Sequence, residues 1–492
     1  MNKRIKNIVT VVLLAAFLFG FGAWAALKPA DSLSLSERRR LKQLPAVRMD
    51  AVLSGKFMSD FEGYALDQFP LRDEWRTLKA LNRLYVYRQK DNNGVYIKDS
   101  YAAKLEYPMN ESSIDHAAER FRYLYENFMA DAGARVYLSV IPDKNYFLAE
   151  TNGYPAIDYE AFVEALREQT DFAQYIDLFG QLTLDDYYRT DSHWRQERLP
   201  AVAAYLAREM GVTLTDEYTE QVLDRPYYGV YYGYAALPMQ PDELRYLTSE
   251  TLEDCTVYNY ETGKPGAVYD MEKGAGNDPY ELFLSGSISL LSIENPNAET
   301  DRELIVFRDS FGSSLAPLLA EGYAKITLAD IRYLPSSQMG KLLDFTDADV
   351  LAVHDIARTV SREAHHLIQF ARLRKMADGS YYAPVSPKCN ALPLAVGYFR
   401  DRFADQRWLV YDLKRRYGYA YDLHEVREVV FESLSDAPSE RLTDDLLDAD
   451  ELAFQRLWKS YFDALAIPER FNPRLQRRQM PARFWKYLIE KE

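Results

Sequence analysis

The N-terminus carries a hydrophobic run that constrains where everything after it can fold. Three cations in the first seven residues precede an uncharged stretch from Ile8 to Leu27. About 20 apolar residues suffice to cross a bilayer as a helix, and a basic flank favours the cytoplasmic side. The pattern predicts a single-pass anchor over residues 1–28, with the rest of the chain extracytoplasmic at the cell membrane. A cleavable signal peptide is the alternative, because Ala23-Trp24-Ala25 fits a small-x-small cleavage site.

Length, charge and cysteine usage narrow the class of protein. A chain of 492 residues exceeds one ordinary core, so two or three domains are expected. A net charge of −15 argues against a nucleic-acid binder, which needs basic residues to displace counterions. The two cysteines, Cys255 and Cys389, lie far apart and in no CxxC spacing. We therefore expect no metal site, no cofactor and no disulfide framework, with one disulfide between them as an alternative.

Strands and helices alternate from about residue 114 onward. This order predicts an α/β domain over residues 114–356, with a mostly parallel sheet in three layers. Residues 215–300 are rich in Tyr and Gly with less regular periodicity, and are interpreted as a strand-rich insertion. The expected elements are helices at 114–131, 158–170, 198–210 and 313–320 and strands at 136–141, 304–307, 325–329 and 349–353.

Two further regions flank this domain. Residues 29–113 are expected to form a juxtamembrane spacer followed by a helical region. Residues 357–492 are richer in Arg and are interpreted as an α-rich C-terminal extension. In a parallel sheet, functional sites lie at the carboxyl ends of the strands. Asp143-Lys144 and Asp309-Ser310 both follow strands in this way.

Ser310 stands where a nucleophile is expected. A hydrophobic strand leads into Asp309-Ser310-Phe311-Gly312, and a helix begins at once. Such a turn exposes the hydroxyl, and the helix N-terminus offers backbone N–H groups to a developing oxyanion. Phe311 N–H is the nearest candidate donor, and Gly312 would let substrate approach the backbone. The alternative is a helix cap formed by Asp309 or Ser310.

A serine nucleophile needs a base, and the chain has only six histidines. His193 lies in a polar turn two residues after Asp191, so that the carboxylate can orient the imidazole and stabilise its protonated form. Alternatively, Asp191 only caps the helix after it. His354, which follows the strand at 349–353, is a rival base. Adjacent His365-His366 does not place both rings on one metal ion.

Residues 1 to about 355 resemble a known family through an ordered set of motifs. The chain is similar to the DHHW family, relatives of the AlgJ and AlgX alginate O-acetyltransferases with an SGNH-hydrolase-like fold. The matching stretches are Ser36-Glu37-Arg38-Arg39 with Leu41 and Pro45, Asp67-Gln68-Phe69-Pro70-Leu71-Arg72-Asp73, Asn93-Gly94-Val95-Tyr96, Ile141-Pro142-Asp143-Lys144, Thr190-Asp191-Ser192-His193-Trp194, Asp309-Ser310-Phe311 and Asp330-Ile331-Arg332-Tyr333.

The resemblance implies roles for these residues. Ser310 would be the nucleophile, His193 the general base and Asp191 its orienter, in an order permuted relative to most SGNH hydrolases. Lys144 and Arg332 would help to bind substrate. The resemblance also implies polysaccharide hydroxyls as acceptors and a membrane-bound O-acyltransferase as the partner that supplies acetyl groups.

The sequence departs from the family pattern at two places. Ser192 stands where the family name expects a second histidine. Leu284-Ser285-Gly286-Ser287 occupies the place where relatives tend to have Gly-Gly-Asn. Gly286 is therefore the residue expected nearest to the oxyanion, without the Asn side chain as a donor.

The segment from about 358 to 492 resembles a different family. It is similar to the second half of an uncharacterised domain found beside radical-SAM proteins and sometimes fused to uracil-DNA-glycosylase-like domains. An anchor would export such a domain away from nucleic acid, which suggests a gene fusion or a sequence-assembly join near residue 357; a genuine helical cap on the sheet is the alternative. The matching stretches are Arg362-Glu363-Ala364-His365, Asp378-Gly379, Tyr382-Ala383, Asn390-Ala391-Leu392-Pro393-Leu394, Arg402-Phe403, Trp408, the run from Pro468 to Gln476, Met480-Pro481 and Trp485-Lys486.

Together these observations predict a membrane-tethered, extracytoplasmic O-acyltransferase or acetylesterase that acts on cell-surface polysaccharide. A non-catalytic polysaccharide-binding or scaffold subunit of the same acetylation and export machinery is the second hypothesis. Cytosolic nucleic-acid processing through the C-terminal segment is disfavoured by the anchor and the net charge.

Overall fold

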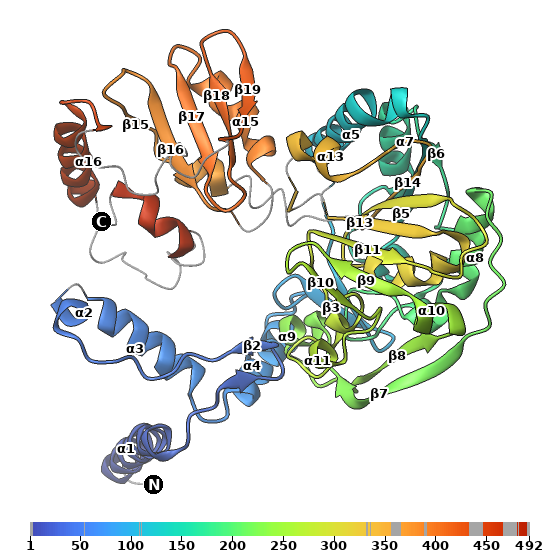
Figure 1. The fold of residues 1–492 in the computed structure, drawn as a ribbon. Coiled ribbons are helices and arrows are strands. Elements are labelled where there is room, and N and C mark those ends of the chain that lie inside the picture. Colours follow the sequence, from blue (N-terminus) through green and yellow to red (C-terminus); the bar gives the residue numbers. More distant parts are fainter. Residues whose placement is uncertain are drawn as a thin grey trace.

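A computed structural model describes residues 3–489, except for 54, 108, 110, 331–332, 335, 356–365, 388–390, 432–445, 466–479 and 481. An α/β domain and a smaller C-terminal lobe make up most of the folded mass, and an N-terminal arm extends from them (Figure 1). The elements of each part follow from the alternation of apolar and polar residues along the chain.

The α/β domain is built on one eight-stranded sheet with the order β10-β9-β11-β13-β12-β14-β5-β6. Strands β13, β12, β14, β5 and β6 are parallel, whereas β10, β9 and β11 extend the sheet antiparallel from β13. The strands are β5 (Arg135–Ile141), β6 (Gln174–Tyr175), β9 (Thr256–Asn259), β10 (Lys264–Gly266), β11 (Leu290–Glu294), β12 (Glu303–Arg308), β13 (Lys325–Ala329) and β14 (Asp349–Asp355).

The sheet is mixed, and its larger part is parallel: four pairings between its described strands are parallel and three are antiparallel. Residues 215–300 do not form one insertion, which corrects that expectation. Strands β9 to β11 complete the main sheet because their buried side chains, such as Val257 and Leu291, share its core. Only the long hairpin of β7 (Thr219–Tyr227) and β8 (Asp242–Thr248) forms a separate sheet.

Both faces of the main sheet are covered, which gives three layers. Along β12, Leu304 and Val306 pack into one core, and Ile305 and Phe307 pack into the core on the opposite face, as the period of two in a strand requires. One face carries α8 (Pro200–Glu209), α12 (Gly312–Leu315) and the 3-10 helix Ala316–Gly322; the other carries α5 (Glu111–Leu124), α7 (Tyr159–Gln169) and α13 (Ser336–Leu342).

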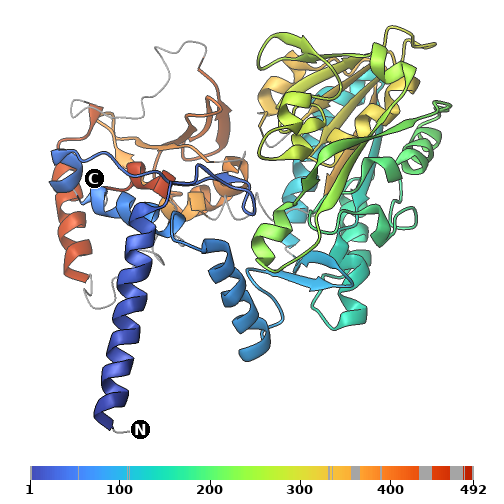
Figure 2. The same ribbon diagram turned by 90° about the horizontal axis from the view of Figure 1, so that it is seen from below.

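The N-terminal arm begins with α1 (Lys3–Leu27), which extends away from the folded lobes (Figure 2). Residues Ile5–Leu27 of this helix are long and apolar enough to cross a membrane. Pro70 separates two amphipathic helices, and the chain turns there through Leu71 at φ 55°. The remaining elements are the hairpin of β1 (Leu33–Ser34) and β2 (Arg39–Arg40), α2 (Met49–Leu53), α3 (Lys56–Asp67), α4 (Arg72–Leu81), the π-helical turn Asn82–Val86, and the hairpin of β3 (Val95–Lys98) and β4 (Tyr101–Lys104).

The C-terminal lobe is a mixed α/β unit, not the α-rich extension expected from its sequence. Its sheet contains β15 to β19 and has a core of its own, separate from those of the α/β domain. Tyr417, Tyr419 and Tyr421 alternate along β18 with their rings in that core, which suits the high strand preference of tyrosine. The elements are β15 (Arg374–Lys375), β16 (Tyr381–Val385), β17 (Trp408–Asp412), β18 (Tyr417–Tyr421), β19 (Val426–Val429), α15 (Leu392–Arg402) and α16 (Glu451–Leu465).

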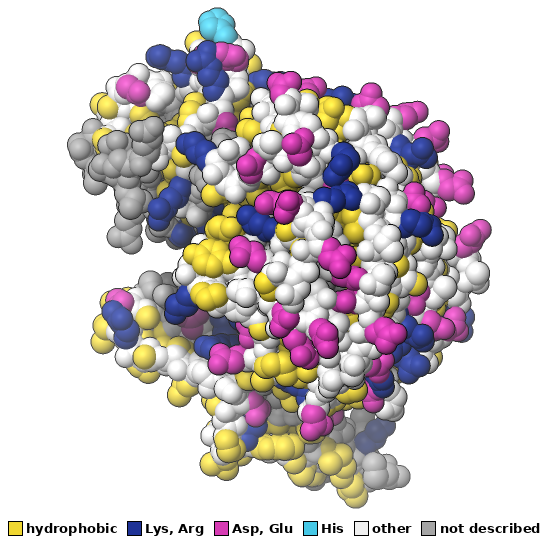
Figure 3. All heavy atoms as spheres, turned by 45° about the vertical axis from the view of Figure 1, so that its right-hand side comes forward, with side chains coloured by type: hydrophobic (Ala, Val, Ile, Leu, Met, Phe, Trp, Pro, Cys, Tyr) yellow, Lys and Arg dark blue, Asp and Glu magenta, His cyan; other side chains and the backbone are white. Residues whose placement is uncertain are grey.

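Two further features are the distribution of charge on the surface and the placement of the two cysteines. On the face shown in Figure 3, acidic and basic side chains are interspersed rather than gathered in fields of one sign. Cys255 is a buried free thiol, whereas Cys389 lies outside the described residues, as do residues 468–476 of the C-terminal motif.

Asp349 offers a test of how the sheet is held together. This fully buried carboxylate at the start of β14 pairs with Arg135 at 2.6 Å and Arg302 at 2.5 Å. We expect Asp349→Ala to lower the free energy of unfolding of the α/β domain by roughly 2–3 kcal/mol, less than for a wholly buried pair because both arginines reach water. Urea unfolding measures the change. Asp171→Ala, which breaks the exposed pair with Arg122, is the control and should change it little.

Candidate active site

Ser310 follows the end of β12 at the carboxyl edge of the sheet. The strand ends at Arg308, three residues form the turn, and α12 begins at Gly312. Ser310 is half-buried, whereas the residues on either side of it are buried. The turn therefore leaves the hydroxyl as the accessible polar group at this position.

The structure brings His193 and Asp191 together with Ser310. His193 Nε2 lies 2.7 Å from Ser310 Oγ, and His193 Nδ1 lies 2.7 Å from Asp191 Oδ1. The three groups form a continuous chain of hydrogen bonds, although His193 and Ser310 lie 117 residues apart in sequence. With Nδ1–H donating to the carboxylate, Nε2 is free to accept the proton of the serine hydroxyl.

Asp191 is fully buried and held by several donors. Its Oδ1 also accepts the Ser192 N–H at 2.7 Å, and Oδ2 accepts the Val230 N–H at 2.8 Å. Burial opposes ionisation of this carboxyl, but the charges and hydrogen bonds of His193 and Arg38 outweigh it and hold its pKa well below the ordinary value. The group is therefore a carboxylate at neutral pH.

Aromatic rings fix the orientation of His193. Its ring stacks on Tyr280 with centroids 3.9 Å apart and an angle of 14°, and Phe311 lies at 4.9 Å on a tilted plane. Tyr280 is anchored in turn, since its hydroxyl lies 2.8 Å from Ser314 Oγ, which also accepts from Trp194 Nε1 at 2.9 Å. The imidazole has little freedom to rotate away from the serine.

The loop that carries Asp191 is tied to the segment between β7 and β8. Asp242 accepts the N–H groups of Arg189 and Thr190 and the Thr190 hydroxyl, the last at 2.6 Å. Gly229 lies directly against Asp191: a Cβ built on it would stand 2.3 Å from the Asp191 Cβ. Only glycine allows this approach.

The structure assigns Phe311 and Gly312 different roles from those expected. Phe311 N–H donates to Asp309 Oδ1 at 2.9 Å and is already committed, so the capping role proposed for Asp309 holds here. Gly312 allows the turn to pack on its own strand, since a Cβ there would stand 2.5 Å from the Arg308 Cβ. Among the described residues, the Ser310 N–H has no hydrogen-bond partner, which leaves it available to an oxyanion.

Gly286 lies in a strained loop beside the serine turn. Leu284, Ser285 and Gly286 have successive positive φ values of 52°, 57° and 81°, a conformation that costs energy at the two non-glycine positions. The Gly286 N–H donates to Phe283 O at 3.1 Å, and its carbonyl accepts from the Arg308 guanidinium at 3.3 Å. Gly286 therefore serves as an acceptor for Arg308, and its own N–H is not free for an oxyanion.

Lys144 lies near Asp191 but does not contact Ser310 or His193 through a hydrogen bond, and two other candidates fall wholly or partly outside the described residues. Lys144 is buried, and its Nζ donates to the carbonyls of Tyr188 at 2.8 Å and Arg189 at 3.2 Å. It therefore stabilises the loop that carries Asp191. Arg332 lies outside the described residues, and of the rival base His354 only the backbone in β14 is described. Within the described ranges, no group of three His, Cys, Asp or Glu residues could hold a metal ion.

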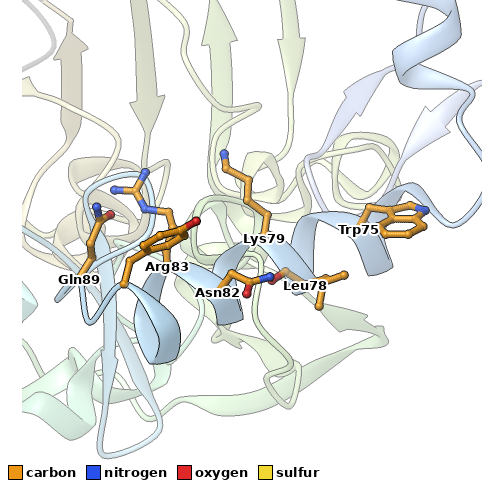
Figure 4. Close-up of a pocket in the computed structure, with 7 residues that line it drawn as sticks. Trp75, Leu78, Lys79, Asn82, Arg83 and Gln89 are labelled. Atoms are coloured by element: carbon orange, nitrogen blue, oxygen red, sulfur yellow. The ribbon is translucent and has the colours of Figure 1, made fainter. Parts of the chain in front are cut away.

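Sequence reasoning missed Gly229, Asp242 and Tyr280, and it noted Arg38 only as part of a motif. No periodicity marks the first three, which reach the site through the loops of the 215–300 region. A separate surface pocket lies along α4, away from these residues (Figure 4). It is lined by Trp75, Leu78, Lys79, Asn82, Arg83, Tyr87 and Gln89.

Gly229→Ala tests the close packing on Asp191. The added methyl must push the carboxylate away from His193, and misplacement of about 1 Å costs on the order of 100-fold in rate. We expect labelling of Ser310 by a serine-directed fluorophosphonate to slow by that factor. Gly180→Ala is the matched control, because nothing lies within 4 Å of its Cβ position. Equal labelling of the two variants would contradict the packing argument.

The lowered pKa of Lys144 predicts that the free energy of unfolding depends on pH. Burial lowers its pKa from 10.5 to about 7, so the folded protein binds fewer protons than the unfolded chain between these values. Stability relative to Lys144→Met should therefore rise with pH across this window, and the penalty is fully present below about pH 7. Chemical denaturation at pH 7 to 10 checks this, with the exposed Lys341→Met as control. Parallel curves for wild type and Lys144→Met would contradict it.

Comparisons with known proteins give one family match and several structural likenesses. A family model described as a domain of unknown function, DUF4130, matches residues 323–490. The match begins before β13, so it includes the last two strands of the main sheet as well as the C-terminal lobe, and extends further toward the N-terminus than the boundary expected near residue 358. No curated protein sequence matches the chain.

Three solved structures are similar to about half of the chain at low identity. A DHHW family protein from Eubacterium siraeum is 19% identical, with a TM-score of 0.44, over 54% of this chain and 91% of that one. Bacillus cereus PatB1 is 16% identical, with a TM-score of 0.43, over 53% and 95%. The O-acetyltransferase domain of Pseudomonas putida AlgJ is 14% identical, with a TM-score of 0.33, over 53% and 90%.

Proposed function

We propose that this chain is a membrane-tethered, extracytoplasmic O-acyltransferase or acetylesterase in which Ser310 is the nucleophile. One observation carries the proposal: the 2.7 Å contact between His193 Nε2 and Ser310 Oγ, continued at 2.7 Å to a buried carboxylate. A serine hydroxyl is a weak nucleophile until a neighbouring base takes its proton. The order of motifs along residues 1–355 supports the same assignment.

The arrangement supports a two-step transfer. Ser310 Oγ attacks the carbonyl carbon of an acyl ester while its proton moves to His193 Nε2. The tetrahedral intermediate then collapses, the bond to the donor alcohol breaks, and the alcohol leaves with that proton. In the second step an acceptor hydroxyl, or water, gives its proton to His193 and attacks the acyl carbonyl carbon. The bond between that carbon and Ser310 Oγ then breaks, and His193 returns the proton to Oγ, which restores the free Ser310.

Asp191 and the backbone supply the electrostatics of this reaction. The carboxylate stabilises the imidazolium that forms in each step and keeps Nδ1 as the donor. The Ser310 N–H is directed at the oxyanion in our proposal, in place of the committed donors of Phe311 and Gly286. Preorganised donors of this kind contribute strongly because they need no reorganisation during the reaction.

The setting implies the substrates. We propose that the acceptors are hydroxyls of cell-surface polysaccharide, and that α1 holds the chain at the membrane where a membrane-bound O-acyltransferase supplies acetyl groups. The helix Ile5–Leu27 supports the tether, and the motif resemblance supports the partner and the acceptor. We also propose that the three triad residues follow one another along the chain in an order permuted relative to most SGNH hydrolases.

A second candidate is a non-catalytic polysaccharide-binding subunit of an acetylation and export complex. The observation that favours it is the loss of two expected oxyanion donors, because the N–H groups of Phe311 and Gly286 are already hydrogen-bonded. Glycan binding that persists without any turnover of acetyl esters, in a protein whose Ser310 does not react with fluorophosphonate, would select this candidate.

Ser310→Ala is the direct test. It should abolish both acetyl-ester turnover and fluorophosphonate labelling, since no other hydroxyl contacts His193 Nε2 among the described residues. Turnover is followed by release of a chromogenic alcohol, and labelling by mass. Ser380→Ala, a substitution in the C-terminal lobe, is the control and should keep wild-type values. Wild-type turnover in Ser310→Ala would rule Ser310 out as the nucleophile.

A further inference from the structure

The segment that follows the membrane helix folds back onto the α/β domain. Residues 33–40 form the short hairpin of β1 and β2, in which Leu33 pairs with Arg40 and Ser34 with Arg39. Its turn brings Arg38 to the site with a positive φ of 52°, a backbone conformation that a long side chain adopts at a cost. Such strain persists only where surrounding contacts hold it.

We call this arrangement the clasp. It consists of Ser36, Glu37 and Arg38 and of the residues that contact them, Arg72, Arg76 and Gly233. Gly233 lies against the hairpin so closely that a Cβ would stand 2.6 Å from Ser36 O. Arg76 donates to Gly233 O at 2.5 Å and to Ser36 Oγ at 3.2 Å, and so joins the two segments. Glu37 is fixed by ion pairs with Arg72 at 2.5 Å and Arg76 at 3.3 Å.

The clasp places the Arg38 guanidinium beside the carboxylate of the triad. Arg38 Nη1 lies 3.5 Å from Asp191 Oδ2 and 2.6 Å from Asp278 Oδ1, and its side chain is only 14% exposed. Oδ2 is the oxygen that His193 does not use. Arg38 therefore faces Asp191 from the side opposite to the imidazole.

We propose that Arg38 is a positioning residue for the triad, acting on His193 through Asp191. Its guanidinium, together with the Val230 N–H, fixes the second carboxylate oxygen so that Oδ1 points at His193. It also offsets part of the negative charge that Asp191 presents to the imidazole. The inference rests on the proposed nucleophilic role of Ser310 and adds to it a requirement for the hairpin next to the membrane helix.

Other charged groups face this carboxylate and set the direction of the effect. Asp278 lies near Arg38, Asp191 and His193. Lys144 lies near Asp191 with Asp242 beside it, and Asp309 lies in the serine turn. Three of these four are acidic, so Arg38 is one of two cations that balance them. Its removal leaves the triad in a more negative surrounding, which should move the acidic limb of the pH profile upward.

The test measures the rate of Ser310 labelling by fluorophosphonate against pH in the full chain in detergent. For Arg38→Gln we expect a maximal rate lower by about 10- to 100-fold and an acidic limb shifted upward by about 0.5–1 pH unit. Arg38→Lys keeps the charge and should hold the limb near its wild-type position. Arg76→Gln loosens the clasp but leaves Arg38 its charge, so it should lower the melting temperature without moving the limb.

Asp278→Asn keeps the inference testable if Arg38→Gln does not fold. Loss of that negative charge beside His193 should move the acidic limb to lower pH. If Arg38→Gln keeps the wild-type acidic limb, or if its maximal rate, acidic limb and melting temperature all match those of Arg76→Gln, then Arg38 is only a structural contact. Neither result would contradict the proposed role of Ser310. Absence of labelling in the wild type overturns both the proposed function and this inference.

Discussion

A buried carboxylate determines much of the structure around it. Asp191 has no access to water, and an ionised group in that position is stable only when donors and cations surround it. Those partners come from parts of the chain far apart in sequence: the imidazole of its own loop, the Val230 N–H after β7, and Arg38 from the hairpin that follows α1. The loops of the α/β domain and the N-terminal arm are thus joined at one charged group.

The same constraint explains the positions that admit no side chain. Gly229 and Gly233 lie four residues apart, one against Asp191 and the other against Ser36, so a single segment packs closely on both the triad loop and the clasp. At each of these glycines, atoms of the neighbouring residue lie closer than an added Cβ would allow. The segment that carries these glycines therefore fixes the distance between the hairpin and the loop of Asp191.

The sequence allowed the three-layer α/β domain to be predicted, since β5, β12, β13 and β14 are apolar runs that alternate with helices. It also indicated Ser310, His193 and Asp191, which the structure brings within hydrogen-bonding distance. It did not indicate Tyr280 or Gly229, because their roles depend on loop packing that has no period. It also missed the strands of the C-terminal lobe, where tyrosines replace the aliphatic residues that usually mark a strand.

The clasp has a consequence for where the chemistry can take place. Arg38 lies only eleven positions after Leu27, the last residue of α1. Even fully extended, such a segment spans no more than about 40 Å, and Arg38 lies beside Asp191. Under the proposed function, with α1 in a bilayer, Ser310 would be held within a few nanometres of the membrane surface. A polysaccharide acceptor would then have to come to that surface, which favours modification of newly exported chains over mature outer material.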